Sequence, residues 1–398
     1  MLKESLDNFE REKDGRKDAA KKIIVSDEAA KEDSAPDESL EENNQRVVLL
    51  AGPHKTATSS IQLNMLRWLN DENHASGLGK DWAWPSPIAT FLEDGCIVQN
   101  GIENYQVFYW WIQAMMGSEK IQCTSGNEKI YSRMEMTDKY TRAFFDHWQK
   151  GSNLVIASEA MDFVTSENPL LGPNVLLENI ISSLPWHANY PPAKASGSDD
   201  DITVVVSYRS PRSRHLISLW HQCCMEKMSF HEWLSNMWGQ KAWIRRKDPL
   251  NSLDSLKIAK VFLDRGLKVV LIDMAGVEEK GYDMSNVIAC DVLNANCSPE
   301  KRFVGDPEEE QAIVNVKSHN ETNFNVTRKQ LERIEEVIQD YDCNYLSLLE
   351  EGNLTVLYSH SIKQTFNFCQ EHAGDDRARN RKDMAKQIAD IVNERRQG

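Results

Sequence analysis

Four short, nearly continuous apolar segments constrain the fold of this chain more than any other feature of its sequence. They are RVVLLAG (46–52), NLVIAS (153–158), ITVVVSY (202–208) and LKVVLID (267–273). Uninterrupted apolar runs of this length are typical of strands that are buried on both faces of a parallel sheet. Long segments separate the runs, as the crossover connections between parallel strands require. The sequence therefore predicts an α/β fold, a three-layer sandwich with a mostly parallel central sheet.

The rest of the chain suggests one domain with a tail and an insertion. Residues 1–45 hold 14 acidic and 8 basic residues and little apolar patterning, so we expect a disordered charged tail. Residues 46–398 would form a single domain. Tryptophans and tyrosines gather in 71–150, which we interpret as an aromatic-rich insertion between the first two strands. Helical spacing predominates in 325–398, the predicted helical C-terminal part.

Charge and hydropathy exclude several classes of partner. The net charge of −15 and the pI near 5.2 argue against general binding to nucleic acid or to acidic membranes. No stretch approaches the roughly 20 apolar residues of a membrane span. We therefore expect no membrane span in this chain, and a cytoplasmic location for the chain as given, or the Golgi if an N-terminal anchor is missing from it.

The cysteines and the glycosylation sequons give weaker predictions. The eight cysteines show no metal-binding spacing, which predicts no metal site and favours buried or free thiols in a reducing compartment. Three Asn-x-Ser/Thr sequons begin at Asn320, Asn325 and Asn353. A chain of this length carries about that many by chance, so the sequons do not decide the compartment.

A polar loop directly follows the first apolar run. Gly52 allows a sharp turn and a close approach of the backbone to an oxyanion, and Lys55 adds a positive charge. Four hydroxyl residues then stand at the start of a helical pattern: Thr56, Thr58, Ser59 and Ser60. A helix N-terminus beyond the carboxyl end of a parallel strand offers free N–H groups to an anion. Because a simple helix cap needs one hydroxyl only, the cluster predicts a phosphate or sulfate site.

A second polar segment follows the third apolar run. Arg209, Arg212 and Arg214 stand close together in the sequence, beside several serines. Arginine binds phosphate through two parallel hydrogen bonds and stays charged, so the segment predicts a second anion site. An exposed charged turn is the alternative interpretation. If both loops follow strands of one parallel sheet, a ligand with phosphates at two ends would use both sites.

The two segments together resemble the signatures of the PAPS-dependent sulfotransferases, where PAPS is 3′-phosphoadenosine 5′-phosphosulfate. The first signature is Gly-x-x-Lys-[Thr/Ser/Gly]-x-[Thr/Ser]-[Thr/Ser], and the chain reads Gly52-Pro53-His54-Lys55-Thr56-Ala57-Thr58-Ser59. The second is Tyr/Phe-Arg-x-Pro followed by a helical serine, and the chain reads Tyr208-Arg209-Ser210-Pro211 and then Ser218. The arginine and the serine stand nine residues apart here, whereas the family often has eight.

The resemblance implies an enzyme that moves a sulfuryl group from PAPS to a hydroxyl or amine acceptor without a metal. The P-loop-like segment 52–59 would hold the 5′-phosphosulfate, with Lys55 stabilising the leaving phosphate. Arg209 and Ser218 would hold the 3′-phosphate. Glu159, just after the second apolar run, is the first candidate for the base, His54 the second and Asp162 the third. The acceptor would be a carbohydrate, another glycan or a polyhydroxyl small molecule.

Two other functions stay open on the sequence alone. A P-loop nucleotide kinase or NTPase would need a Gly-Lys-Ser/Thr ending to the loop, which is absent, and a Mg-binding carboxylate, for which Asp273 is the candidate. A non-catalytic nucleotide- or glycan-binding member of the fold is the other alternative. The presence of Lys55 and Arg209 argues against it. The sequence does not determine the oligomeric state.

Overall fold

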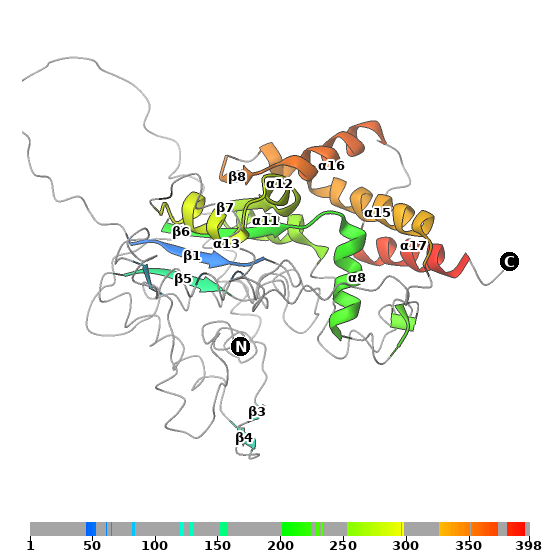
Figure 1. Ribbon diagram of the computed structural model, residues 1–398, viewed down its shortest axis with the longest axis horizontal. Helices are drawn as coiled ribbons and strands as arrows, with labels where there is room; N and C mark the ends of the chain where they lie inside the picture. The colour runs from blue at the N-terminus through cyan, green and yellow to red at the C-terminus, as the bar shows by residue number, and fades with distance from the viewer. Residues whose placement is uncertain are drawn as a thin grey trace, which may run out of the picture. The chain divides into compact units, whose positions relative to one another are not determined.

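The computed structural model describes residues 45–52, 61, 65, 82–83, 120–122, 128–130, 152–157, 201–223, 228–230, 232–233, 253–295, 297, 326–350, 352–372 and 380–394 (Figure 1). These residues all belong to one compact unit that covers 44–398, and a second unit covers 1–43. Nearly all of the predicted tail, 1–45, and most of the aromatic-rich segment 71–150 lie outside the described residues.

Six strands form one parallel sheet. Their order is β2-β5-β1-β6-β7-β8, and every neighbouring pair is parallel. The strands are β1 (Val47–Leu50), β2 (Trp82–Ala83), β5 (Asn153–Ala157), β6 (Ile202–Tyr208), β7 (Lys268–Asp273) and β8 (Leu354–Leu357). A separate antiparallel pair is formed by β3 (Lys120–Gln122) and β4 (Glu128–Ile130). The predicted α/β fold with a mostly parallel sheet is confirmed.

The four central strands are the four apolar runs of the sequence. All seven residues of β6 are buried, and so are all four of β1, as expected for strands covered on both faces. The two edge strands were not predicted. β2 is only two residues long, and β8 lies inside the segment predicted to be helical. The described residues of 325–398 thus supply three α-helices and also one strand.

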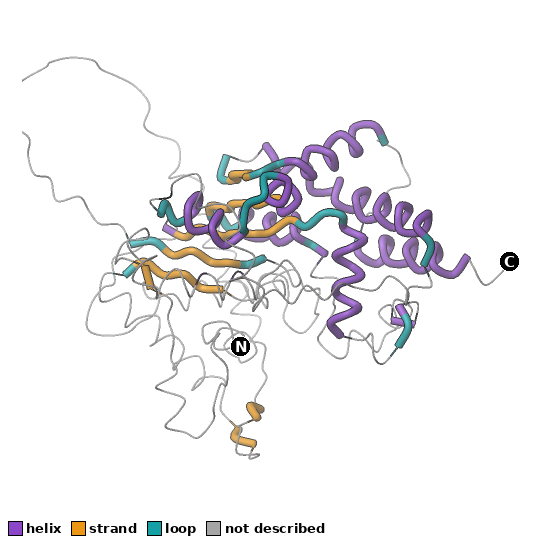
Figure 2. The backbone as a smooth tube through the Cα atoms, in the orientation of Figure 1, coloured by secondary structure: helices purple, strands orange, loops and turns teal. Residues whose placement is uncertain are grey.

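Helices connect the strands and extend beyond them (Figure 2). Their bounds are α8 (Arg212–Cys223), α11 (Ser255–Asp264), α12 (Met274–Glu279), α13 (Met284–Val287), α15 (Arg328–Asp342), α16 (His360–Glu371) and α17 (Arg381–Asn393), with a π-helical turn η4 (Ile288–Val292) and a 3-10 segment η7 (Cys343–Glu350). α15 packs against α8, α16 and α17. A second apolar cluster fills the space between these helices, with Leu216, Ile334 and Ile388 fully buried.

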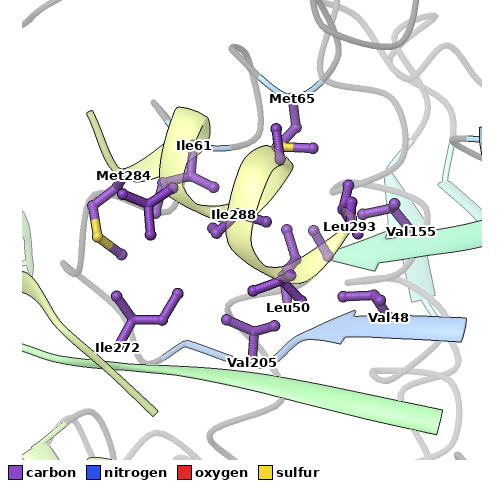
Figure 3. Packing of buried hydrophobic residues seen from close by; sticks show 14 of the residues in the cluster. Val48, Leu50, Ile61, Met65, Val155, Val205, Ile272, Met284, Ile288 and Leu293 are labelled. Atoms are coloured by element: carbon purple, nitrogen blue, oxygen red, sulfur yellow. The ribbon is translucent and has the colours of Figure 1, made fainter. Parts of the chain in front are cut away.

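Both faces of the sheet are covered. On one face, Val48 and Leu50 of β1 and Val205 of β6 pack against η4 and against Ile61 and Met65, which follow the first loop in the sequence (Figure 3). Alternate residues of a strand point to opposite faces, so the other face carries the intervening residues, which are also buried. There α11 packs on β6 and β7 through its apolar side.

Four cysteines form two disulfides. Cys290 in η4 is bonded to Cys297, and Cys343 at the start of η7 is bonded to Cys369 in α16. The expectation of free thiols is therefore wrong for these four residues. Their spacings of 7 and 26 residues match no pattern that identifies a disulfide from sequence alone.

Candidate functional site

The predicted site segments follow three neighbouring strands of the sheet. Leu50, the last residue of β1, pairs with Ala157 on β5 and with Val205 on β6. In Figure 1 the three strands run side by side, and β6 leads into α8. The carboxyl ends of parallel strands meet at one edge of the sheet, where ligands of open α/β sheets bind. The loop that starts at Gly52, the segment that contains Glu159 and the turn at Arg209 therefore all leave from the same edge.

Most of the first predicted loop lies outside the described residues. Gly52 is described and buried, and the backbone N–H of the preceding Ala51 donates to the carbonyl oxygen of Val205 at 2.9 Å. Sheet pairing therefore continues one residue beyond β1 before the loop begins. The other predicted residues that lie outside the described part are Pro53, His54, Lys55, Thr56, Ala57, Thr58, Ser59, Ser60, Glu159 and Asp162.

Arg209 is the predicted site residue whose surroundings are best defined. It is the first residue after β6 and is half-buried, and Arg214 on the first turn of α8 is exposed. Burial lowers the pKa of Arg209, the nearby charge of Arg214 lowers it further, and the carboxylate of Glu278 opposes both. A nearby anion would stabilise the charged form of a guanidinium that is partly buried and close to a second cation. The carboxyl end of β6 therefore carries two cations, Arg209 and Arg214, close to the carboxylate of Glu278.

Arg212 has a different role. Its side chain is fully buried, and its Nε lies 3.1 Å from Oδ2 of Asp342, with the guanidinium 4.8 Å from the centre of the Tyr208 ring. Nη2 also donates to the carbonyl oxygen of Leu253, and Nη1 to that of Arg209 at 3.5 Å. The expectation that Arg212 joins the other arginines in an anion site is wrong. It is the buried partner of a carboxylate and fixes the backbone on which Arg209 stands.

The polar network around Arg212 closes on three buried residues. The hydroxyl of Tyr208 donates to Oδ2 of Asp342 at 3.1 Å and lies 3.0 Å from the hydroxyl oxygen of Thr365. Burial raises the pKa of Asp342 to about 6, although Arg212 and the Tyr208 hydrogen bond act in the opposite direction. Burial and then the Asp342 charge raise the pKa of Tyr208, so this phenol stays neutral. The network anchors the end of β6 to α15 and α16.

The N-terminus of α8 is already occupied by a carboxylate. The backbone N–H of Arg212 donates to Oε1 of Glu335 at 2.9 Å, and that of Ser213 donates to Oε2 at 2.6 Å. Glu335 comes from the middle of α15 and satisfies two of the amides that a helix start leaves without a partner. An anion at this edge would therefore meet the side chain of Arg209 and not these two amides.

Ser218 lies deeper in α8 than the sequence pattern implies. It is 7% exposed, and its hydroxyl donates to the carbonyl oxygen of Arg214 at 3.0 Å, one turn earlier in the same helix. The hydroxyl oxygen keeps acceptor capacity, but its proton is already used within the helix. Of the two residues predicted for a 3′-phosphate, Arg209 has the surroundings that fit this role better.

Asp273, the candidate magnesium ligand of a kinase or NTPase, is a helix cap. It is fully buried, and its carboxylate accepts hydrogen bonds from the N–H of Ala275, the N–H and the hydroxyl of Ser361, and the N–H of Ile362. The four bonds use both oxygens and fix the starts of α12 and α16. A carboxylate with this set of donors is a poor metal ligand.

Several residues that shape this edge could not be found from the sequence. Glu335 and Asp342 lie more than 120 positions after their α8 partners, and Thr365 lies 157 positions after Tyr208. Each lies in a segment with ordinary helical spacing, so no local pattern marks it. The one available indication was the excess of cations after β6, which requires some counter-charge elsewhere in the chain.

No known protein family, curated protein or solved structure matches this chain. Among the described residues, no group of three or more His, Cys, Asp or Glu side chains is arranged to hold a metal ion. None of the described helices is long and apolar enough to cross a bilayer.

Proposed function

We propose that this protein is a sulfotransferase that moves a sulfuryl group from PAPS to a hydroxyl or amine acceptor. The acceptor would be a carbohydrate or another polyhydroxyl compound, a glycan or a small molecule. The observation that carries the proposal is the adjacency of β5, β1 and β6, which brings three separate candidate segments to one sheet edge. These segments lie up to 157 positions apart in the sequence, between Gly52 and Arg209.

The described residues fit a donor with a second phosphate. Arg209 is half-buried at the carboxyl end of β6, and the exposed Arg214 lies close enough to affect its pKa. Arg209 would bind the 3′-phosphate, and Nη1 of Arg212 donates a hydrogen bond to the backbone carbonyl oxygen of Arg209. Ser218 would have to exchange its hydrogen bond to the carbonyl oxygen of Arg214 for one to the phosphate, because an ionised phosphate only accepts hydrogen bonds. A donor that lacks the 3′-phosphate would gain nothing from Arg209.

The chemistry of the transfer requires three contributions from the chain. When bound, PAPS supplies the sulfuryl group and a phosphate that leaves with negative charge. Lys55 would stabilise that charge, together with the backbone N–H groups and hydroxyls of Thr56, Thr58 and Ser59. Glu159 would take the proton of the acceptor, with His54 as the second candidate. Gly52, Pro53 and Ala57 would shape the loop around the 5′-phosphosulfate.

Ligand choice separates the proposal from the nucleotide kinase. We expect 3′,5′-adenosine bisphosphate to raise the melting temperature of the protein in the absence of Mg²⁺, since binding to the native state alone stabilises it. Replacing Arg209 by Ala should weaken this binding about 10- to 100-fold, the loss expected for one charge-assisted contact. Arg328→Ala is the matched control, because Arg328 is an exposed arginine on α15 that pairs with Glu332 one turn later in the same helix.

Transfer from labelled PAPS to a panel of glycans, phenols, steroids and amines tests the reaction itself. Lys55→Ala should lower kcat about 100- to 1000-fold, as the loss of one group that stabilises developing charge does. Glu159→Gln should lower kcat with little change in the affinity for 3′,5′-adenosine bisphosphate. Equal rates for the wild type and Lys55→Ala would overturn the catalytic assignment, and binding without transfer would indicate a non-catalytic member of the fold. Stabilisation by Mg-ATP alone would indicate the kinase.

A further inference from the structure

The sequon at Asn353 lies on an exposed turn. Asn353 and Gly352 form the turn that precedes β8, and the sequon continues through Leu354 to Thr355. Asn353 and Thr355 are both exposed, whereas Leu354 is half-buried. The two polar residues that a glycosylating enzyme must recognise are thus the two that the structure presents to solvent. Asn320 and Asn325, which begin the other sequons, lie outside the described residues.

Two neighbouring glycines leave space around this asparagine. A Cβ atom added to Gly352 or to Gly266 would meet no atom of the described residues within 4 Å. Gly266 belongs to the adjacent turn, and its carbonyl oxygen lies 3.4 Å from Nδ2 of Asn353. The side-chain amide carries two hydrogens and this long contact uses one of them, so a substituted nitrogen could keep it. The backbone carbonyl of Asn353 accepts from Val269 at 2.9 Å and holds the turn in place.

The disulfides give an independent indication of the compartment. Cys343 and Cys369 lie on either side of the sequon, in η7 and α16, and their bond joins the two elements that flank β8. Disulfides persist in oxidising compartments such as the lumen of the secretory pathway and are rare in the cytosol. N-linked glycosylation takes place in the same oxidising lumen. The segment 343–369 therefore contains a disulfide and an exposed sequon, two features that are compatible with folding in this lumen.

We propose that Asn353 is an N-glycosylation site and that the protein folds in an oxidising compartment of the secretory pathway. In the modification, Nδ2 of Asn353 attacks the anomeric carbon of a lipid-pyrophosphate-linked oligosaccharide. The new C–N bond replaces the anomeric C–O bond, the lipid pyrophosphate leaves, and one amide proton passes to a base of the transferring enzyme. This modification is independent of the sulfotransferase proposal, because Asn353 lies at the amino end of β8 and the proposed site lies at the carboxyl ends of the strands.

A glycan at this position would also cover an edge of the sheet. β8 is the last strand in the sheet order, and edge strands present backbone groups that can pair with other chains. A bulky, hydrated substituent at the start of β8 would block such pairing. The position of the sequon at the start of an edge strand thus has a physical consequence, which is protection of that edge from pairing with other chains.

The test is to direct the full chain into the secretory pathway of a eukaryotic cell and to digest the secreted protein with trypsin. The peptide 334–363 contains Asn353 and no other sequon. Release of the glycan by an amidase in heavy-oxygen water converts a glycosylated asparagine into a mass-labelled aspartate. We expect most copies of this peptide to carry the label at position 353.

Three variants make the test specific. Asn353→Gln and Thr355→Ala should remove the label from the peptide, and Thr355→Ser, which keeps the sequon, should retain it. Asn344→Gln is the matched control, since Asn344 is exposed in the same peptide but begins no sequon. An unlabelled peptide 334–363 from secreted wild-type protein would overturn the proposal. So would a labelled peptide in Thr355→Ala, because the modification would then not be sequon-dependent.

Discussion

Arg212 and Asp342 form the most deeply buried charge pair on the β6 side of the described residues, with side chains 0% and 1% exposed. Tyr208 donates to Asp342, Arg212 donates to the carbonyl oxygen of Leu253, and Thr365 lies within hydrogen-bond distance of the Tyr208 hydroxyl. Breaking such a pair from one side leaves an uncompensated buried charge, whereas removing both charges together is often nearly neutral. The pair therefore makes the turn before α8 sensitive to single substitutions.

Arg212→Met should lower the free energy of unfolding by about 3–5 kcal/mol, because it leaves Asp342 buried without its cation. Asp342→Asn resembles the protonated carboxyl group and should lower it much less. The double variant, Arg212→Met with Asp342→Leu, should recover most of that loss, because neither charge is then left buried without its partner. Urea unfolding followed by tryptophan fluorescence measures all three. Arg328→Ala serves as the exposed control and should change the free energy by less than about 0.5 kcal/mol. Additive losses in the double variant would show that the two side chains are not coupled.

The same carboxyl group makes stability depend on pH. The pKa of Asp342 is raised from 3.8 to about 6, so the native state holds this proton more tightly than the unfolded state does. The stabilising contribution is complete below about pH 4 and is lost as the pH rises through about 6. Wild type should therefore lose up to ~3 kcal/mol across this window relative to Asp342→Asn, which has no proton to lose. A difference that does not change between pH 4 and pH 7 would contradict the assignment.

At the scale of elements, α15 connects the sheet edge to the C-terminal helices. It supplies Glu335 to the start of α8 and ends at Asp342, and its own start is closed by a capping box between Thr327 and Gln330. A capping box satisfies two N–H groups that the first helical turn leaves free. The cap at the beginning of α15 thus helps to position Glu335 and Asp342, which lie more than one turn later in the same helix.

Thr327→Ala should lower the free energy of unfolding by about 1 kcal/mol, the usual loss for an N-cap hydroxyl. Hydrogen exchange should be faster at the first amides of α15, where the hydroxyl of Thr327 now accepts from the N–H of Gln330. Thr327→Ser should restore both properties, since serine caps equally well. Ser347→Ala, at an exposed position of η7, is the matched control for the loss of a hydroxyl. Equal stability of Thr327→Ala and wild type would show that α15 does not need its cap.

The central elements could be predicted from the sequence, and the edges could not. The runs that became β1, β5, β6 and β7 are apolar on both faces, and that pattern has one common structural solution. β2 has two residues, and β8 has one exposed and three half-buried residues inside a segment with helical spacing, so neither carries a periodic pattern of its own. Their places in the sheet follow from pairing with β5 and β7, which is a property of the folded chain.

For the whole molecule, the two disulfides differ in how much of the chain they constrain. Cys343 and Cys369 are separated by 26 residues, and Cys290 and Cys297 by 7. In the chain-entropy account, these loops correspond to about 3.5 and about 2.4 kcal/mol of stabilisation. The longer loop contains η7, β8 and the start of α16, so it limits the freedom of one whole edge of the sheet.

Replacing both Cys343 and Cys369 by Ser should lower the melting temperature more than replacing both Cys290 and Cys297. Thermal unfolding of the two double variants measures the difference, and peptide mapping without reduction checks both pairings in the wild type. A reductant, which breaks both disulfides, should lower the melting temperature of the wild type more than either pair of substitutions does. If peptide mapping finds all four thiols free in protein from an oxidising compartment, the pairings described above are wrong.

The positions of the candidate segments in the fold could be predicted, because these segments follow strands that the apolar runs identify. Arg209 was found from its place after β6, and its role as a phosphate ligand stays a prediction. Arg212 was misassigned, because sequence shows that an arginine is present but not that a carboxylate 130 positions later is buried against it. The charge on a side chain is local information, and its partner is determined by how α15 packs on α8.

The unequal lengths of β1 and β6 have a consequence for what can bind at their ends. Val205 is level with Leu50, and β6 continues for three residues beyond Val205 before it reaches Arg209. If the chain beyond Leu50 follows the same rise, Arg209 stands two residues further along the strand direction than Gly52, a step of ~7 Å. Two anionic groups on one ligand would have to match this step to contact both positions. In the proposed function, the sheet edge would therefore favour a donor whose two anionic groups are separated by this step over a ligand with a single phosphate.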